Sequence, residues 1–260
     1  TWLPGSDAAN QIRNVAVDEA ERLLAVGQWG SHRVALYDLE RRELAAELGY
    51  RAEQRGEFQP INVLLDGDRV LVVNIWYPRV IELSRATGAV TRVVDLYDLG
   101  LVGNGVQLVG AGLSQRRGRL WIAIAQPGTN LVELDLATLA PGRSVDLDTT
   151  FPGSFTYDDV AGRIYLTSFR SAAIEVVDVD AMREVDEIEG TIGARETAVD
   201  PERGLLFVMD YLHGRVLFHS LAERRVVRRV AVGPKPGGAV VFDGTLYVNA
   251  TVGVVAIPLD

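Results

Sequence analysis

Residues 155–178 read FTYDDVAGRIYLTSFRSAAIEVVD, a stretch with three short β-rich runs separated by two turns. Phe155 to Asp158 is followed by Ile164 to Thr167 and then by Ile174 to Val177. β-Branched and aromatic residues favour strands, and runs this short between turn residues are not typical of helices. The stretch therefore predicts an antiparallel meander of short strands.

The same pattern occurs six times along the chain. Each time, an aliphatic stretch closes at a turn and a second aliphatic stretch follows it. The closing positions are 18, 66, 115, 158, 200 and 243, so successive repeats lie 48, 49, 43, 42 and 43 residues apart. A period of this length is typical of four-stranded blades arranged around an axis. We therefore predict an all-β fold, a six-bladed β-propeller of four-stranded antiparallel blades without a long helix.

The sixth repeat lacks residues for a fourth strand within the sequence given, which stops at Asp260. Trp2 and Leu3 are the candidates to supply that strand, since the neighbouring Pro4 is tolerated at the edge of a sheet. We predict a propeller closed by N- and C-terminal strands, with Trp2-Leu3 beside residues 254–256. The alternative is a longer parent chain that carries its own fourth strand beyond Asp260.

Composition limits the function classes. A chain of 260 residues with 48% hydrophobic residues can bury one core, so we expect a single β-propeller domain over residues 1–260. No apolar run reaches the roughly 20 residues that cross a bilayer, and we expect no direct membrane insertion. The net charge of −9 argues against nucleic acid as a partner, because that affinity depends on clustered cations. With no cysteine, disulfides, thiolate metal sites and c-type haem are excluded, and we expect no cofactor.

Two of the second strands carry a recognisable motif. Residues 246–250, LYVNA, and residues 164–168, IYLTS, are each followed by a short loop and a third strand rich in aliphatic residues. They resemble the YVTN-type repeats of bacterial propellers such as the YncE-like and surface-layer proteins. The resemblance covers essentially the whole chain and implies a propeller that is often exported, hence a periplasmic or extracellular location. It implies no activity, and typical members have seven blades where this chain has six repeats.

The loops between second and third strands share one face of a propeller with the blade-to-blade connections. Four of these six loops combine an aromatic residue with an arginine, and two of the connections, residues 49–60 and 97–112, are unusually long. Aromatic residues and arginine dominate binding hot spots. The candidate ligand- or partner-binding residues are Trp29, His32, Arg33, Trp76, Tyr77, Arg79, Phe169, Arg170, Arg195, Tyr211, His213 and Arg215. For each residue alone the alternative is structural, since an arginine can pair with a nearby acid and a tryptophan can cover the core.

These features predict a non-enzymatic binding propeller, a module of a larger exported protein or complex, that engages an anionic or glycan-like ligand or an acidic protein segment. The alternative is a metal-dependent hydrolase or lactonase similar to regucalcin and gluconolactonase-like six-bladed propellers. The oxygen ligands would come from the starts of the first strands, at Asn14, Asn62, Ser154 and Glu196. Only Glu196 is a carboxylate, and no nucleophile stands beside a base, so the sequence favours binding over catalysis.

Histidine is scarce, with three residues in the chain. His32 and His213 occupy loops of the predicted binding face and could approach one ligand, although no Ser-His-Asp spacing connects them. His219 falls at the end of a third strand, and we expect it at the surface.

Overall fold

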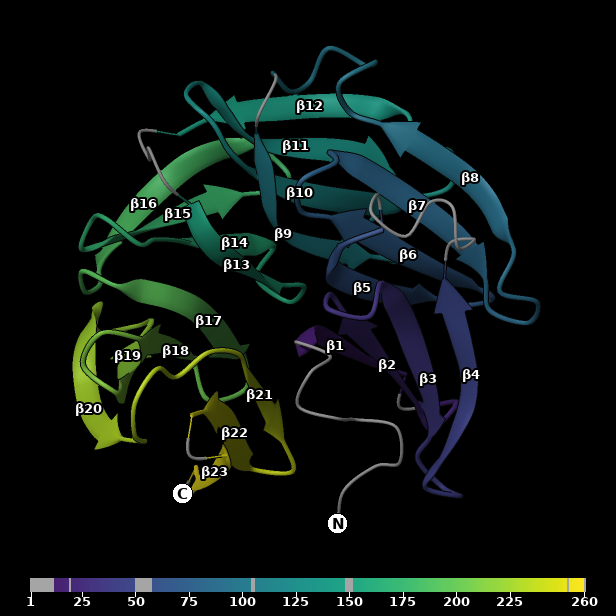
Figure 1. The fold of residues 1–260 in the computed structure, drawn as a ribbon. Helices are drawn as coiled ribbons and strands as arrows, with labels where there is room; N and C mark the ends of the chain where they lie inside the picture. The colour runs from purple at the N-terminus through teal and green to yellow at the C-terminus, as the bar shows by residue number, and fades with distance from the viewer. Residues whose placement is uncertain are drawn as a thin grey trace. The chain divides into compact units, whose positions relative to one another are not determined.

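The computed structural model describes residues 12–18, 20–49, 58–103, 106–147, 152–251 and 253–259, which form strands and turns without a helix (Figure 1). The strands make six antiparallel sheets, five with four strands and one with three among the described residues. The fold is the predicted six-bladed β-propeller, and each sheet is one blade. No helix in the described part of the chain is long and apolar enough to cross a membrane. The predicted strand at Trp2 and Leu3 lies outside the described residues.

The strands follow chain order within every blade. Blade one contains β1 (Ile12–Asp18), β2 (Leu23–Gln28), β3 (Arg33–Asp38) and β4 (Glu43–Gly49). Blade two contains β5 (Pro60–Asp66), β6 (Arg69–Asn74), β7 (Arg79–Ser84) and β8 (Val90–Asp95). Blade three contains β9 (Gln107–Ser114), β10 (Arg119–Ala125), β11 (Thr129–Asp135) and β12 (Pro141–Asp146).

The later blades repeat this arrangement. Blade four contains β13 (Pro152–Asp158), β14 (Arg163–Ser168), β15 (Ala173–Asp178) and β16 (Arg183–Glu189). Blade five contains β17 (Ala194–Asp200), β18 (Leu205–Asp210), β19 (Arg215–Ser220) and β20 (Arg225–Ala231). Blade six contains β21 (Ala239–Phe242), β22 (Thr245–Ala250) and β23 (Gly253–Pro258).

Burial follows the position of a strand within its blade. The third strands β3, β7, β15 and β19 are buried at four consecutive positions each, whereas the fourth strands β4, β16 and β20 are mostly exposed. A strand that is covered on both faces needs continuous rather than alternating apolar residues. The continuously buried aliphatic runs that follow each first strand are therefore the middle strands of the blades.

Four of the first strands contain an irregularity near their start. Pairing with the second strand shifts between Ile12 and Asn14 in β1, between Pro60 and Asn62 in β5, and between Ala194 and Glu196 in β17, and a similar shift occurs in β13. A β-bulge leaves one residue outside the ladder and changes the direction of its side chain. Arg195 is that extra residue in β17.

Aspartates at strand ends hold the turns. The carboxylates of Asp38, Asp135 and Asp178 accept backbone N–H groups two or three residues further on. For Asp178, the N–H of Ala181 lies 2.8 Å from Oδ1, and this bond is the main cause that lowers the pKa of the carboxyl. Each such acid replaces the ladder partner that the turning backbone has lost.

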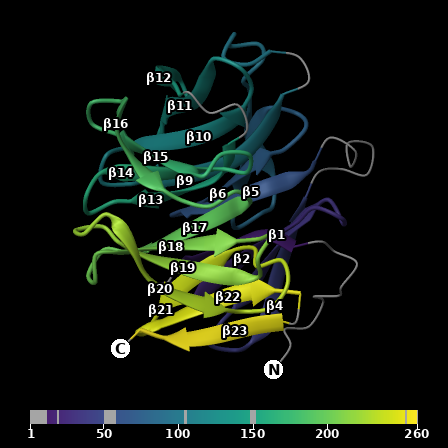
Figure 2. The same cartoon turned by 90° about the vertical axis from the view of Figure 1, so that its left-hand side faces the viewer.

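The chain contacts divide into two compact units. One holds residues 1–120 with 135–141, the other holds residues 121–134 with 142–260, and the division passes through blade three. In the first unit an apolar cluster that includes Phe58, Val63 and Ile81 fills the space between blades one and two. In the second unit, blades four, five and six stack face to face around two further clusters (Figure 2). The single domain over residues 1–260 stays a prediction.

The structure corrects the expected surface location of His219, whose side chain is only 1% exposed. The residue lies in β19, which is covered on both faces, and it shares a face with Leu217 two residues earlier. Leu217 belongs to the apolar cluster between blades four and five, so His219 faces the same layer. Its place near a strand end does not expose it, because the neighbouring blade covers that end.

Candidate functional site

In the first unit, two candidate loops lie at the same end of their blades. The loop between β2 and β3 contributes His32, whose Nδ1 lies 2.8 Å from the carbonyl oxygen of Phe58. The loop between β6 and β7 contributes Ile75, whose N–H donates to the carbonyl of Gln59 at 3.1 Å. Both loops therefore adjoin the segment that leads into β5, as the meander predicts.

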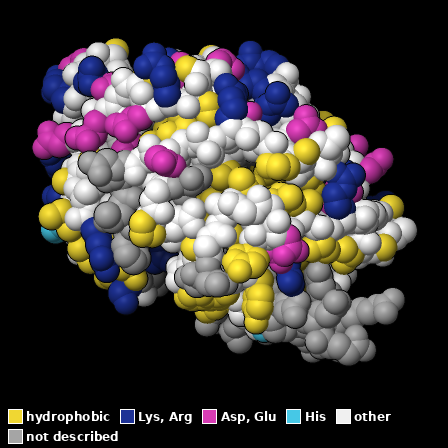
Figure 3. Space-filling view, turned by 90° about the horizontal axis from the view of Figure 1, so that it is seen from above, with side chains coloured by type: hydrophobic (Ala, Val, Ile, Leu, Met, Phe, Trp, Pro, Cys, Tyr) yellow, Lys and Arg dark blue, Asp and Glu magenta, His cyan; other side chains and the backbone are white. Residues whose placement is uncertain are grey.

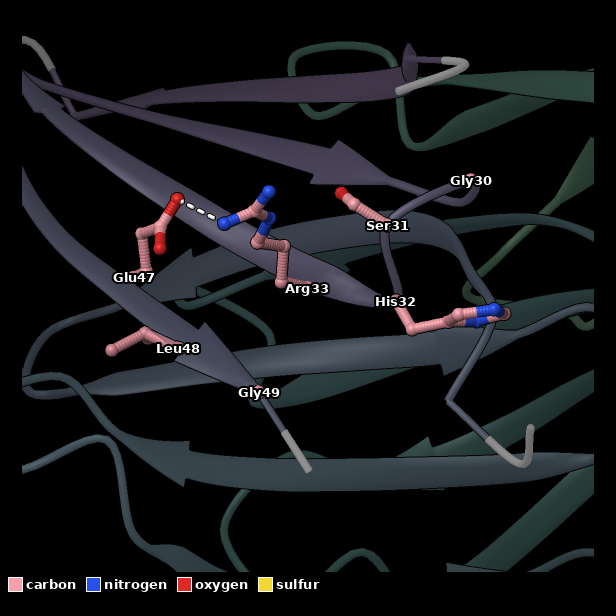
Figure 4. A pocket seen from close by; sticks show the side chains of 7 residues that line it. All are labelled: Gly30, Ser31, His32, Arg33, Glu47, Leu48 and Gly49. Atoms are coloured by element: carbon pink, nitrogen blue, oxygen red, sulfur yellow. Dashed lines mark hydrogen bonds and ion pairs between the residues drawn. The ribbon is translucent and has the colours of Figure 1, made fainter. Parts of the chain in front are cut away.

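The first of these loops is held by its own side chains. His32 has a left-handed backbone with φ of 56°, and its N–H lies 3.4 Å from the carbonyl of the partly buried Trp29. The Arg33 guanidinium lies 2.6 Å from Glu47 of β4. This ion pair and His32 line an open hollow of about 480 Å³, and in Figure 4 the imidazole of His32 points away from the ion pair. Both His32 and Arg33 thus have structural partners within the first unit.

The loop between β6 and β7 exposes two aromatic rings. Trp76 is 48% exposed and Tyr77 is 40% exposed, and the guanidinium of Arg79 lies 5.9 Å from the centre of the Tyr77 ring. Arg79 also donates from Nε to Asp95 at 2.8 Å. The predicted aromatic and arginine pair is therefore present, with the arginine already neutralised by an acid of β8.

In the second unit, one glycine joins two candidate loops. The N–H of Gly193 donates to the carbonyl of Phe169, and its own carbonyl accepts from the N–H of Tyr211, both at 3.1 Å. Gly193 has φ of 86°, and a Cβ there would lie 2.4 Å from Cγ of Leu212. Only glycine fits this conformation and this space without strain. The join places the loop after β14 beside the loop after β18.

Three of the predicted residues meet at this join, and we call Phe169, Arg195 and Tyr211 the Arg195 cluster. The rings of Phe169 and Tyr211 are 6.1 Å apart in an edge-to-face arrangement. The guanidinium of Arg195 lies 5.0 Å from the centre of the Tyr211 ring, which is a cation–π contact. The bulge in β17 turns Arg195 toward this ring. The cluster brings together side chains from blades four and five that are far apart in sequence.

The remaining candidates of the second unit surround a buried acid. Asp210 is 0% exposed and ends β18. Its carboxylate lies 2.7 Å from Nδ1 of His213 and 2.8 Å from Nε of Arg215. Asp210 thereby neutralises Arg215 and orients His213, which is itself exposed, as is Arg170. His213 belongs to the second unit and His32 to the first.

Two of the four residues named for the alternative metal site use their oxygen atoms in hydrogen bonds within the fold. Oδ1 of Asn14 accepts the N–H of Val63 at 3.0 Å and so links β1 to β5. The carbonyl oxygen of Ser154 accepts the hydroxyl of Thr167 at 3.0 Å. Asn62 and Glu196 occupy the equivalent positions of β5 and β17. Within the described ranges, no three His, Cys, Asp or Glu side chains are grouped to hold a metal ion.

Sequence reasoning missed two residues that organise the second-unit site, Asp210 and Gly193. A signal for Asp210 exists, because the second strands of four blades end in a buried polar residue: Gln28, Asn74, Ser168 and Asp210. Beside Gly193, Ile192 and Leu212 are more than half exposed, at 57% and 56%. On the face shown in Figure 3, hydrophobic side chains similarly lie exposed among basic and acidic ones.

Comparison with known proteins supports the fold alone. No family model matches the sequence, and no curated protein matches it. The computationally designed protein Ika8 is similar in structure, with a TM-score of 0.68 and 12% identity over 95% of this chain and 70% of its own. A chain of the hydrazine synthase of Kuenenia stuttgartiensis aligns with a TM-score of 0.67 and 13% identity, over 99% of both chains. At such identities, the likeness establishes a shared β-propeller architecture.

Proposed function

We propose that this chain is a non-enzymatic binding propeller whose Arg195 cluster recognises an acidic segment of a partner protein. The observation that carries the proposal is the state of Arg195. Its guanidinium stacks on Tyr211, and no acidic side chain of the described residues forms an ion pair with it. Arg33, Arg79 and Arg215, by contrast, are each paired with an acid.

An unpaired arginine of this kind suits a carboxylate. The planar guanidinium can donate two parallel hydrogen bonds to a carboxylate, and its stacking on a ring fixes its orientation before the ligand arrives. The protein carries a net charge of −9, so the lack of an acid beside Arg195 among the described residues is more readily explained by an external anion than by a shortage of internal acids. The proposed anionic group would bind at the edge of the Arg195 guanidinium, in its plane.

The surroundings of the cluster favour a peptide over a small anion. Phe169, Ile192 and Leu212 are exposed at 38%, 57% and 56%, and they flank the join at Gly193. A partner segment with apolar side chains on either side of an acidic residue would cover these groups while its carboxylate meets Arg195. Arginine and aromatic side chains are the residues that are enriched at the centre of protein interfaces. We also propose that the protein belongs to the YVTN-type propellers and is exported from the cell.

The test uses an array of 12-residue peptides in which Asp or Glu stands between apolar residues, each printed beside its Asn or Gln counterpart. Wild-type protein should bind the acidic forms preferentially. Arg195→Ala and Tyr211→Ala should each weaken binding about 5- to 150-fold, which corresponds to about 1–3 kcal/mol. Arg195→Lys should recover only part of the loss, because lysine lacks the planar fork.

Arg228→Ala is the matched control. Arg228 stacks on Phe218 at the same 5.0 Å, but it lies on the outer strand β20, away from the loops. Its removal should leave peptide binding unchanged. Equal binding of acidic peptides by wild type and Arg195→Ala, or preferential binding of the Asn and Gln forms, would refute the proposed function.

A further inference from the structure

His219 combines burial with an absence of hydrogen bonds. Its side chain is 1% exposed, and neither ring nitrogen has a hydrogen-bond partner among the described residues. A neutral imidazole carries one N–H donor and one acceptor, and a protonated ring carries two donors and a charge. The neutral ring is therefore poorly accommodated, and the protonated ring is worse, because a charge without a partner is costly to bury.

The ring lies in an apolar layer between two blades. Leu206 of β18 and Val226 of β20 stand directly opposite His219 in the sheet register. Both belong to, or pack against, the cluster that fills the space between blades four and five, together with Ile174 and Ile188 from blade four. His219 is thus part of the packing that holds these two blades together.

The other repeats show what this position normally contains. The second-last residue of the third strand is buried and carries an apolar or aromatic side chain in every other blade: Tyr37, Leu83, Leu134, Val177 and Ile257. The fold therefore needs an apolar group here, and a histidine provides no packing advantage over leucine. Its distinctive property is that its charge can change between about pH 5 and 8.

The charged and titratable groups around the ring do not offset its burial. Burial is the largest cause acting on His219 and lowers its pKa, Glu189 of β16 raises it, and Arg229 of β20 lowers it further. Tyr165 of β14 belongs to the same apolar layer, and burial raises its pKa to about 12. Tyr165 is therefore uncharged at acidic and neutral pH.

We propose that His219 is an acid-sensitive switch in the packing of blade four against blade five, which loosens when the imidazole takes up a proton. The Arg195 cluster crosses the same interface, since Phe169 follows β14 and Tyr211 follows β18. Loosening of the blades would therefore also separate the two rings. An effect of the switch on ligand binding rests on the proposed function. The loosening of the two blades does not, because it requires no ligand.

The direction of the pH effect follows from the lowered pKa. In the unfolded chain the ring takes up a proton near its ordinary value of about 6.5, whereas the folded chain resists protonation until a lower pH. The contribution of neutral His219 to stability is thus fully present above about pH 6.5 and is lost as the pH falls through the folded pKa. Below that pH the group causes no further loss.

The first experiment compares urea unfolding of wild type and His219→Leu at several pH values from 8 to 5, without ligand. Leucine copies the residue of blades two and three at this position. The unfolding equilibrium constant of wild type should rise about tenfold for each pH unit between the two pKa values, relative to that of the variant. Ile188→Val, which trims the same apolar layer without removing a titratable group, should keep the wild-type pH dependence. Identical pH dependence of wild type and His219→Leu would overturn the switch.

A second experiment needs no variant. The three imidazoles of wild type can be followed by their Cε1–H resonances during an acid titration, and amide hydrogen exchange can be measured at pH 7.5 and 5.5. One imidazole should titrate below the ordinary value of about 6.5, and the amides of β16 and β19 should exchange faster at pH 5.5 after correction for intrinsic rates. The absence of any imidazole resonance that titrates below about pH 6.5, or unchanged protection in β16 and β19, would overturn the proposal even if His219→Leu fails to fold.

Discussion

Replacing Gly193 by alanine should destabilise the protein by about 2–4 kcal/mol, through two separable causes. The first is the backbone, because φ of 86° costs an L-residue about 1–2 kcal/mol. About 0.5 kcal/mol of this cost is offset, since an unfolded chain with alanine has less conformational entropy to lose than one with glycine. The second is steric, because the new Cβ would stand 2.4 Å from Cγ and 2.6 Å from Cδ1 of Leu212. Overpacking of this kind typically costs about 1–3 kcal/mol.

A double-mutant cycle separates the two causes. Leu212 is 56% exposed, so Leu212→Ala alone should cost little, and in the double variant it should return the loss at Gly193 to about 1 kcal/mol. Gly204→Ala is the reference for the backbone effect alone, since Gly204 has φ of 61° and open space around its Cβ position. Urea unfolding can be followed by the fluorescence of buried Trp121 and by far-UV circular dichroism, with coincident transitions required. The reasoning fails if Gly193→Ala and Gly204→Ala cost the same, or if Leu212→Ala rescues nothing.

Three further predictions concern stability. Arg22→Gly should raise the free energy of unfolding by up to about 1 kcal/mol, because Arg22 has a left-handed backbone with φ of 51° in an exposed turn. A lower free energy of unfolding in urea would contradict this. Arg143→Ala should lower the free energy of unfolding by about 2–4 kcal/mol, because it removes the guanidinium that lies 2.8 Å from the buried carboxylate of Glu133. The double variant Arg143→Ala with Glu133→Gln should lose less, since no unpaired charge stays buried. Equal losses of stability in urea unfolding would show that the buried charge is unimportant. Burial raises the pKa of Tyr165 to about 12, so the contribution of the neutral phenol to stability is present below about pH 10 and is lost as the pH rises through 12. Tyr165→Phe should therefore reduce the fall of the urea midpoint at alkaline pH. An unchanged fall in the variant would show that Tyr165 does not cause it.

The fold was predictable because it rests on local patterns. The spacing of the aliphatic runs indicates repeated strands, and the turn acids Asp38, Asp135 and Asp178 mark their ends. A four-stranded meander has only one simple order, so the period alone determines which loops share a face. The composition of those loops then identified Phe169 and Tyr211 as candidates. These inferences need nothing beyond neighbours in sequence and the alternation of strand faces.

The state of each candidate side chain depended on contacts between strands and blades. Arg79 and Arg195 each lie beside a tyrosine ring, yet Arg79 is paired with Asp95, whereas Arg195 lies at a bulge of β17 and stacks on Tyr211 in the loop after β18. His219 shows the same limit, because its burial is created by the facing blade rather than by β19 itself. A sequence specifies which face of a strand a residue occupies, but burial, ion pairing and hence pKa depend on what the neighbouring sheet places opposite it. Only the tertiary structure therefore decided the burial, the ion pairs and the pKa values of these side chains.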